Sequence, residues 1–173
     1  MASDLPFTIV EENSNNMSIS KEYLSWPQIE AMVKQLADGM RGRSFDALLA
    51  VTRGGLVPAG MIAYHLGLRN ILVAAVQFYT GVGRRAAAPT FLQFPADPFI
   101  SGKTVLIVDD IWDSGKTISA VRTRVQAAGG MPVTAVLHYK PNASLFADVP
   151  DHYVEATDAW IVYPWETADE SED

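Results

Sequence analysis

Residues 105–117 read VLIVDDIWDSGKT, an apolar run that passes directly into three acids and then a glycine. The apolar half is typical of a buried strand. Asp109, Asp110 and Asp113 lie close together, although like charges repel one another and folding does not require them there. Either a cation or a polar ligand lies among these carboxylates, or the cluster is simply a solvated loop.

Apolar segments and amphipathic segments alternate on both sides of this stretch. Ser25 and Gln28 have the spacing of a capping box, and apolar residues follow them at helical intervals. We expect helices at residues 25–40, 58–66 and 115–128, and strands at 46–51, 71–76, 104–108 and 133–137. This alternation predicts an α/β fold, a mostly parallel twisted sheet with helices on both faces.

Residues 77–102 contain glycines, three prolines and paired arginines without a sustained period. A loop of this length inside a compact domain is more often a lid or a binding loop than a spacer. We therefore expect a long loop here that serves as a lid or a binding loop.

Two of the predicted strand ends contain unusual chemistry, namely residues 52–55 (TRGG) and residues 109–117. Ligands of such sheets gather beyond the carboxyl ends of the strands, so the coincidence indicates one site. The turn at residues 113–117 opens a helix, where free backbone N–H groups favour an anion. Taken alone, that turn is also compatible with an ordinary helix cap, and TRGG with a tight turn that bears a surface arginine.

Two nucleotide-binding motifs are excluded. Gly-Lys-Thr ends the P-loop motif, but that motif needs a glycine where this chain has Asp110. Residues 81–86 (GVGRRA) match the dinucleotide fingerprint, but Pro89 interrupts the helix that this motif must open.

The whole stretch 105–117 resembles the phosphoribosyl pyrophosphate (PRPP) signature of the type I phosphoribosyltransferases. The resemblance implies that Asp109 and Asp110 engage the ribose hydroxyls and the Mg²⁺ of Mg·PRPP, and carboxylate oxygens suit this hard cation. Asp113 would lie near N7 of a purine as a general acid–base group. The ribose 5-phosphate would be held by Ser114, Gly115, Lys116 and Thr117.

Residues 50–58 (AVTRGGLVP) resemble the pyrophosphate-binding loop of the bacterial xanthine–guanine phosphoribosyltransferases. By that resemblance Arg53 would bind the pyrophosphate through charge-assisted hydrogen bonds and Gly54 by close backbone approach. Arg85 falls where an arginine of the family reaches PRPP, but Arg84 stands beside it, and either residue could take that role.

The C-terminal part resembles the purine-binding segments of the same family. Lys140, in HYKP, would donate to the 6-oxo group of the base, with a solvated lysine as the alternative. In residues 158–166 (DAWIVYPWE), Trp160 would stack on the base and Ile161 would present its backbone. Glu166 would take the place of an aspartate near the exocyclic edge, and His138 is expected to be packed rather than catalytic.

Composition bounds the remaining possibilities. The 173 residues have a net charge of −7, no cysteine and three histidines without metal-ligand spacing. An acidic chain without a basic patch argues against binding of nucleic acid, and no apolar run is long enough for a membrane span.

We expect an N-terminal extension (1–20), one phosphoribosyltransferase domain (21–166, with a small hood mainly at 140–166) and an acidic tail (167–173). We also expect a cytoplasmic homodimer or homotetramer.

The resemblance implies a Mg²⁺-dependent purine salvage enzyme in which residues 79–100 form a long mobile catalytic loop. It would convert guanine, xanthine or hypoxanthine and PRPP to the nucleoside 5′-monophosphate and pyrophosphate. Two alternatives stay open: a regulator of the same fold that binds PRPP or a nucleotide without catalysis, and a phosphoribosyltransferase for another base.

Overall fold

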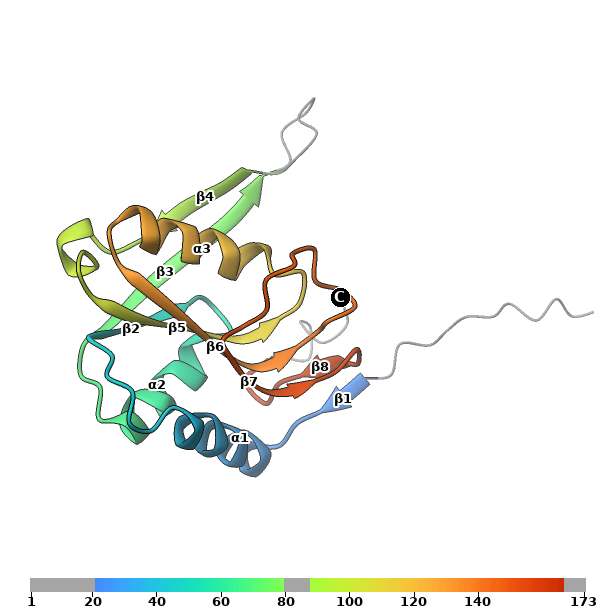
Figure 1. The fold of residues 1–173 in the computed structure, drawn as a ribbon. Coiled ribbons are helices and arrows are strands. Elements are labelled where there is room, and N and C mark those ends of the chain that lie inside the picture. Colours follow the sequence, from blue (N-terminus) through green and yellow to red (C-terminus); the bar gives the residue numbers. More distant parts are fainter. Residues whose placement is uncertain (1–20, 80–87, 167–173) are drawn as a thin grey trace, which may run out of the picture.

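The computed structural model describes residues 21–79 and 88–166 (Figure 1). In this part of the chain, six strands form one sheet in the order β4-β3-β2-β5-β6-β7, in which only β4 runs antiparallel to its neighbour. The strands are β2 (Ala47–Val51), β3 (Ile71–Tyr79), β4 (Ala88–Gln93), β5 (Thr104–Trp112), β6 (Met131–Tyr139) and β7 (His152–Ala156). The mostly parallel α/β sheet predicted from the sequence is confirmed.

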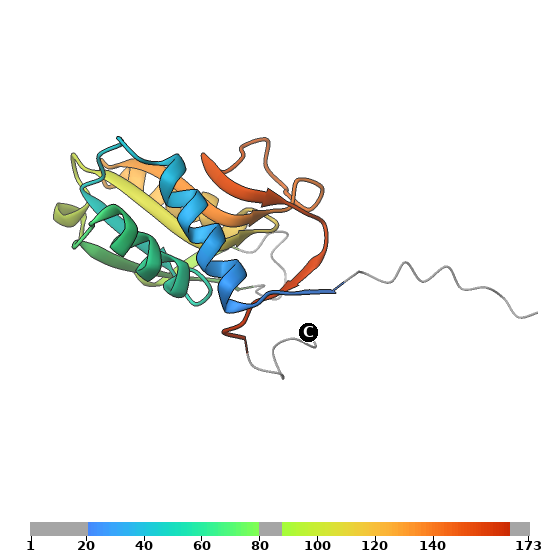
Figure 2. The same cartoon turned by 90° about the horizontal axis from the view of Figure 1, so that it is seen from below.

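Helices cover both faces of the sheet. α1 (Trp26–Gly39) and α2 (Leu56–Leu66) lie side by side on one face, and α3 (Lys116–Ala127) lies on the other (Figures 1 and 2). Every residue of β2 is buried, because alternate side chains enter the two layers. Leu48 packs with the α1 and α2 layer, whereas Leu49 packs with Val121 and Val125 of α3.

The start of α1 follows the predicted capping pattern. The side-chain oxygen of Gln28 accepts hydrogen bonds from the backbone N–H of Ser25 at 2.9 Å and from its hydroxyl at 2.7 Å. The second predicted helix, α2, ends at Gly67 as expected. Gly67 adopts a left-handed φ of 68°, a conformation that favours glycine. The three predicted helices and four predicted strands are thus present, with shifted ends.

Strand β5 is longer than predicted. It continues past Val108 to Trp112, because β6 also continues and pairs with it as far as Tyr139. The burial of Trp112, which is 1% exposed, favours this continuation. Asp109 and Asp110 therefore lie in the strand itself rather than in the loop after it.

The prediction of a long loop over residues 77–102 is wrong for the described parts of that segment. β3 extends to Tyr79, β4 pairs antiparallel with it, and a 3-10 helix, η1 (Asp97–Phe99), follows. Pro89 does not prevent the strand because β4 is at the edge of the sheet, where a missing N–H is tolerated. Residues 80–87 lie outside the described residues, and the predicted mobility of the segment stays a prediction.

A second, two-stranded sheet joins the two ends of the described chain. β1 (Lys21–Tyr23) pairs in parallel with β8 (Trp160–Val162), so that Glu22 is opposite Ile161. Within the predicted hood at 140–166, β7 belongs to the main sheet and β8 to this small one. The predicted extension and tail, residues 1–20 and 167–173, lie outside the described residues.

Candidate active site

The carboxyl ends of β2 and β5 lie next to each other, as a parallel pair requires. Asp109 and Asp110 are each only 9% exposed at this edge. The backbone at Gly54, just after β2, lies so near Asp110 that a Cβ on Gly54 would overlap its carboxylate. The two strand ends predicted to share a site are therefore in contact.

Burial changes the proton affinity of both acids. Desolvation raises the pKa of Asp109 well above its ordinary value, and the charge of Asp110 raises it further. Desolvation also raises the pKa of Asp110, to about 6. Two adjacent carboxylates that resist ionisation in this way would be stabilised as anions by a cation.

The end of β5, the turn after it and the start of α3 surround a small cavity. Residues 109–118 line this cavity of about 200 Å³, which we call the cup. Gly115 adopts a left-handed φ of 78°, and a Cβ there would lie 2.5 Å from the indole nitrogen of Trp112. The sequence Asp-Ser-Gly-Lys-Thr thus turns sharply over the Trp112 ring and leads into the N-terminus of α3, a position where free backbone N–H groups favour an anion. The four residues predicted to bind the 5′-phosphate, Ser114, Gly115, Lys116 and Thr117, all line it.

A larger cavity of about 500 Å³ lies on the other side of Asp110. Arg53, Gly54 and Glu166 line it together with Asp110, which therefore joins the two cavities. The Thr52–Arg53 peptide bond is cis. The structure thus brings the predicted pyrophosphate-binding residues to the carboxylate pair.

Three of the residues predicted to contact a purine lie together. The Lys140 ammonium is 3.4 Å from a carboxylate oxygen of Asp113 and 5.7 Å from the centre of the Trp160 ring. The side chain of Lys140 is only 12% exposed, whereas that of Asp113 is 54% exposed. A buried lysine between a carboxylate and an aromatic face argues against the alternative of a solvated lysine.

The other predicted site residues are placed differently. Ile161 is 6% exposed and lies in β8 beside Trp160. Glu166 turns back to accept a hydrogen bond from the backbone N–H of Tyr163 at 3.2 Å, and it lines the cavity of Arg53 rather than the Lys140 group. Arg85 and its neighbour Arg84 lie outside the described residues.

The sequence did not indicate a buried hydrogen-bonded link under the site. Tyr163 donates to the backbone carbonyl of Asp110 at 3.1 Å, and its oxygen lies 2.7 Å from Nδ1 of His138. Since the Tyr163 proton goes to Asp110, Nδ1 of His138 must be the donor in that contact. Burial lowers the pKa of His138 to about 4, in agreement with a packed, neutral ring. Only the aromatic character of residues 138 and 163 was available as a signal.

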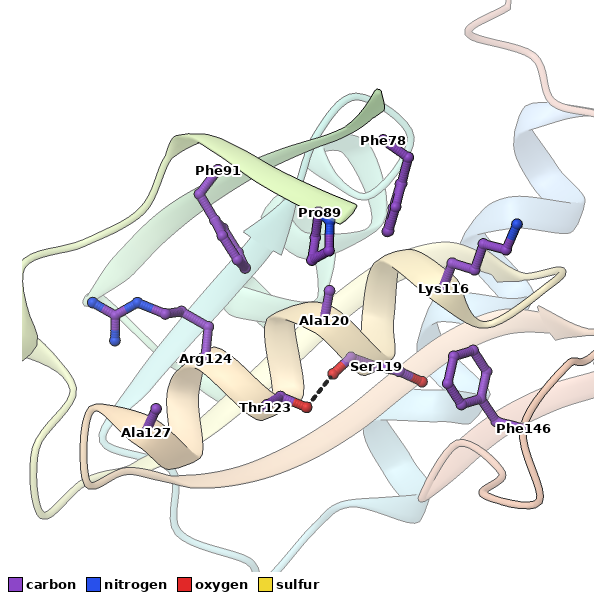
Figure 3. Close-up of a pocket in the computed structure, with 10 residues that line it drawn as sticks. All are labelled: Phe78, Pro89, Phe91, Lys116, Ser119, Ala120, Thr123, Arg124, Ala127 and Phe146. Carbon is purple, nitrogen blue, oxygen red and sulfur yellow. Dashed lines mark hydrogen bonds between the residues drawn. The ribbon is translucent and has the colours of Figure 1, made fainter. Parts of the chain in front are cut away.

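A further pocket, of about 520 Å³, lies apart from the carboxylates. Figure 3 shows it between α3 and the end of the β3–β4 pair, with Phe78, Pro89 and Phe91 facing the helix. Among the described residues that line it there is no acid, and Lys116 is the residue that it shares with the cup. Its apolar lining does not suit a phosphorylated sugar.

The residues present fit Mg²⁺ shared with a substrate. Among the described residues there is no cluster of three or more His, Cys, Asp or Glu that could form an all-protein metal cage. Asp109 and Asp110 supply only carboxylate oxygens, and Mg²⁺ is commonly bound by one or two carboxylates together with substrate phosphates. None of the described helices has the length and apolar character needed to cross a bilayer.

Comparisons with known proteins agree with this geometry. Residues 20–172 match the family model described as "Phosphoribosyl transferase domain". A xanthine-guanine phosphoribosyltransferase of Gluconobacter oxydans is 32% identical over 160 residues, 90% of each chain, and one of Ruegeria sp. is 33% identical over 84% of this chain and 85% of its own. Among solved structures, a purine phosphoribosyltransferase of Pyrococcus horikoshii is 36% identical with a TM-score of 0.76, over 85% of this chain and 95% of its own.

Proposed function

The chain belongs to the phosphoribosyl transferase family, and from this premise we propose that it is a purine salvage enzyme. It transfers the phosphoribosyl group of PRPP to a ring nitrogen of a 6-oxopurine, guanine, xanthine or hypoxanthine. The products are the nucleoside 5′-monophosphate and pyrophosphate. The names of the relatives above support the purine class.

The observation that supports this proposal most is the group Asp113, Lys140 and Trp160. A lysine ammonium only donates hydrogen bonds, so Lys140 suits a 6-oxo group and not the 6-amino group of adenine. The Trp160 ring, over which Lys140 lies, offers a face on which a purine can stack. Asp113 lies 3.4 Å from Lys140 and can accept a proton from a ring nitrogen of the base.

The remaining residues would act on PRPP. The cup of residues 113–117 would bind the 5′-phosphate through backbone N–H groups and hydroxyls. Asp109 and Asp110 would bind the ribose hydroxyls, and Arg53 would stabilise the negative charge that develops on the pyrophosphate as its bond to the anomeric carbon breaks. The electron pair of that bond leaves with the pyrophosphate, and the purine nitrogen supplies the new pair.

We also propose that Mg²⁺ is required and that Asp109 and Asp110 hold it with PRPP. When bound, the ion would neutralise charge on the pyrophosphate oxygens. Turnover should therefore stop on addition of EDTA and return with excess Mg²⁺. The homodimer or homotetramer and the cytoplasmic location stay predictions.

An ultraviolet assay with Mg·PRPP and guanine, xanthine, hypoxanthine or adenine in parallel tests the function. We expect nucleotide formation with at least one 6-oxopurine and none with adenine. Asp113→Asn should reduce kcat by about 10²- to 10⁴-fold, whereas Asp148→Asn, a matched change at an exposed aspartate outside the site, should leave it unchanged. Nucleotide binding without turnover would instead indicate the non-catalytic regulator, and turnover with adenine a different base specificity.

A further inference from the structure

The segment of residues 140–146 contacts the phosphate cup at several points. The backbone N–H of Leu145 donates to the carbonyl of Ser114 at 3.0 Å, and that of Lys140 to the carbonyl of Trp112 at 2.9 Å. The indole N–H of Trp112 donates to the hydroxyl of Ser144 at 3.1 Å. A segment far along the chain from the PRPP signature thus supports the turn that would bind the 5′-phosphate.

Trp112 is the central part of this support. It is 1% exposed, its ring packs edge-on against Tyr139 at 6.4 Å, and its indole nitrogen lies directly beneath Gly115. No side chain separates the ring from Gly115, so the ring supports the backbone of the turn from below. A change in the orientation of Trp112 should therefore alter the position of Gly115 and of the turn.

The hydroxyl of Ser144 fixes that orientation. It accepts the Trp112 N–H, and it also exchanges hydrogen bonds with the backbone of Phe146, donating to its carbonyl at 3.2 Å and lying 3.4 Å from its nitrogen. The oxygen thereby ties the indole to a short turn of the main chain.

We propose that Trp112 and Ser144 are positioning residues for the 5′-phosphate site. Neither side chain has to touch the substrate: Ser144 holds the Trp112 indole, and the indole holds Gly115 and the cup. The inference rests on the proposed function and assigns a role to two residues to which the resemblance gave none: Trp112, within the stretch 105–117, and Ser144, outside it. The backbone N–H of Lys140 bonds to the main-chain carbonyl of Trp112 and not to its indole, and the Lys140 ammonium contacts Asp113, so a change at the indole should act mainly on the phosphate side.

The test uses Ser144→Ala in the full chain, with steady-state kinetics. Loss of one hydrogen bond should raise the KM for PRPP by about 3- to 10-fold, with kcat and the purine KM within about twofold of wild type. Ser144→Thr, which keeps the hydroxyl, should restore the PRPP KM. Ser119→Ala is the matched control, because Ser119 lines the apolar pocket one turn along α3 and not the cup.

A double-mutant cycle adds a second readout. Trp112→Phe removes the donor of the same hydrogen bond, so its effect and that of Ser144→Ala should not multiply in the double variant. Calorimetry should show weaker binding of GMP to Ser144→Ala and unchanged binding of guanosine, which lacks the phosphate.

Three results would overturn the inference. One is an unchanged PRPP KM and GMP affinity in Ser144→Ala. Another is a lower kcat together with similarly raised KM values for PRPP and for the purine, which Ser144→Thr does not restore. That result would indicate a general structural defect. If the wild-type chain neither turns over nor binds GMP, the proposed function fails and this inference fails with it. An active wild type with an unaffected Ser144→Ala variant contradicts the inference alone.

Discussion

Asp109 and Asp110 lie on β5, a central strand with parallel partners on both sides, whereas Lys140 and Trp160 lie on segments outside the main sheet. Lys140 follows the last residue of β6, and Trp160 lies in the two-stranded sheet of β1 and β8. The side proposed to bind ribose and pyrophosphate is thus built on the main sheet, and the side proposed to bind the purine on the segments beside it, where Lys140 contacts Asp113 through its side chain.

The difference indicates how the two sides should respond to substitution. On the side of Asp109 and Asp110, backbone and carboxylates pack so closely that a Cβ added at Gly54 or Gly55 would overlap neighbouring groups. On the other side, single side chains can be replaced without disturbing a ladder. Effects on PRPP and on the purine should therefore separate.

Asp110→Asn should have the largest effect. It removes a carboxylate proposed to bind ribose and Mg²⁺, and turnover should fall on the order of 10³-fold. Without ligand the variant should be more stable than wild type above pH 7, by up to about 3 kcal/mol, because the raised pKa of about 6 marks a costly buried charge. Urea unfolding without Mg²⁺ measures this, and a less stable variant would show that the charge is already compensated in the free protein.

Gly54→Ala should come next. Its Cβ would overlap the Asp110 carboxylate, so the KM for PRPP should rise at least about tenfold and stability should fall by about 1–3 kcal/mol. The matched control is Gly60→Ala in the middle of α2, where a Cβ meets nothing within 4 Å. That change should raise stability by about 0.5–1 kcal/mol without altering the kinetics. Equal behaviour of the two variants would contradict the close contact of Gly54 with Asp110.

Lys140→Met should separate the two sides. Loss of a charged donor to the 6-oxo group should reduce kcat/KM for the purine by about 10- to 100-fold. The KM for PRPP should stay within about twofold of wild type. Lys34→Met, at an exposed lysine of α1, should change neither value. A Lys140→Met variant that keeps full activity would favour an enzyme for another base.

The smallest effect is expected in stability below neutral pH. The pKa of His138 is lowered from 6.5 to about 4, so the unfolded chain takes up a proton first as the pH falls below 6.5. This group therefore lowers stability as the pH falls, by about 2 kcal/mol between pH 6.5 and 5. Asp110, with its raised pKa, acts in the opposite direction over the same range. The unfolding free energy of wild type minus that of His138→Gln should decrease toward pH 5, and a constant difference would mean that the His138 pKa is not lowered.

Much of the ribose–pyrophosphate side could be predicted from the sequence because its residues are nearly contiguous. The strand, the acids and the helix start all fall within residues 105–117, and local chemistry determines their arrangement. The longer β5 was missed because its last residues are stabilised by pairing with β6, a contact that is distant in sequence. The pairing of β4 with β3 was missed for a similar reason, since residues 77–102 have no sustained period and β4 is stabilised by its pairing with β3.

The purine side could be predicted only as a set of residues. The resemblance implied that Asp113, Lys140 and Trp160 meet at one base, but nothing in the sequence indicates that Lys140 contacts Asp113 directly or that Glu166 lines the Arg53 cavity. The Trp112–Ser144 bond and the Tyr163 link to Asp110 were invisible for the same reason. Their partners are brought together only by the folded sheet.

Phosphorus NMR of Mg·PRPP incubated with the protein and hypoxanthine or guanine tests the central claim most directly, because it observes both products. We predict that the PRPP signals disappear while pyrophosphate and a nucleoside 5′-monophosphate appear in equal amounts, and only when a 6-oxopurine is present. Persistence of PRPP with every 6-oxopurine, or release of pyrophosphate with ribose 5-phosphate and no nucleotide, would contradict it.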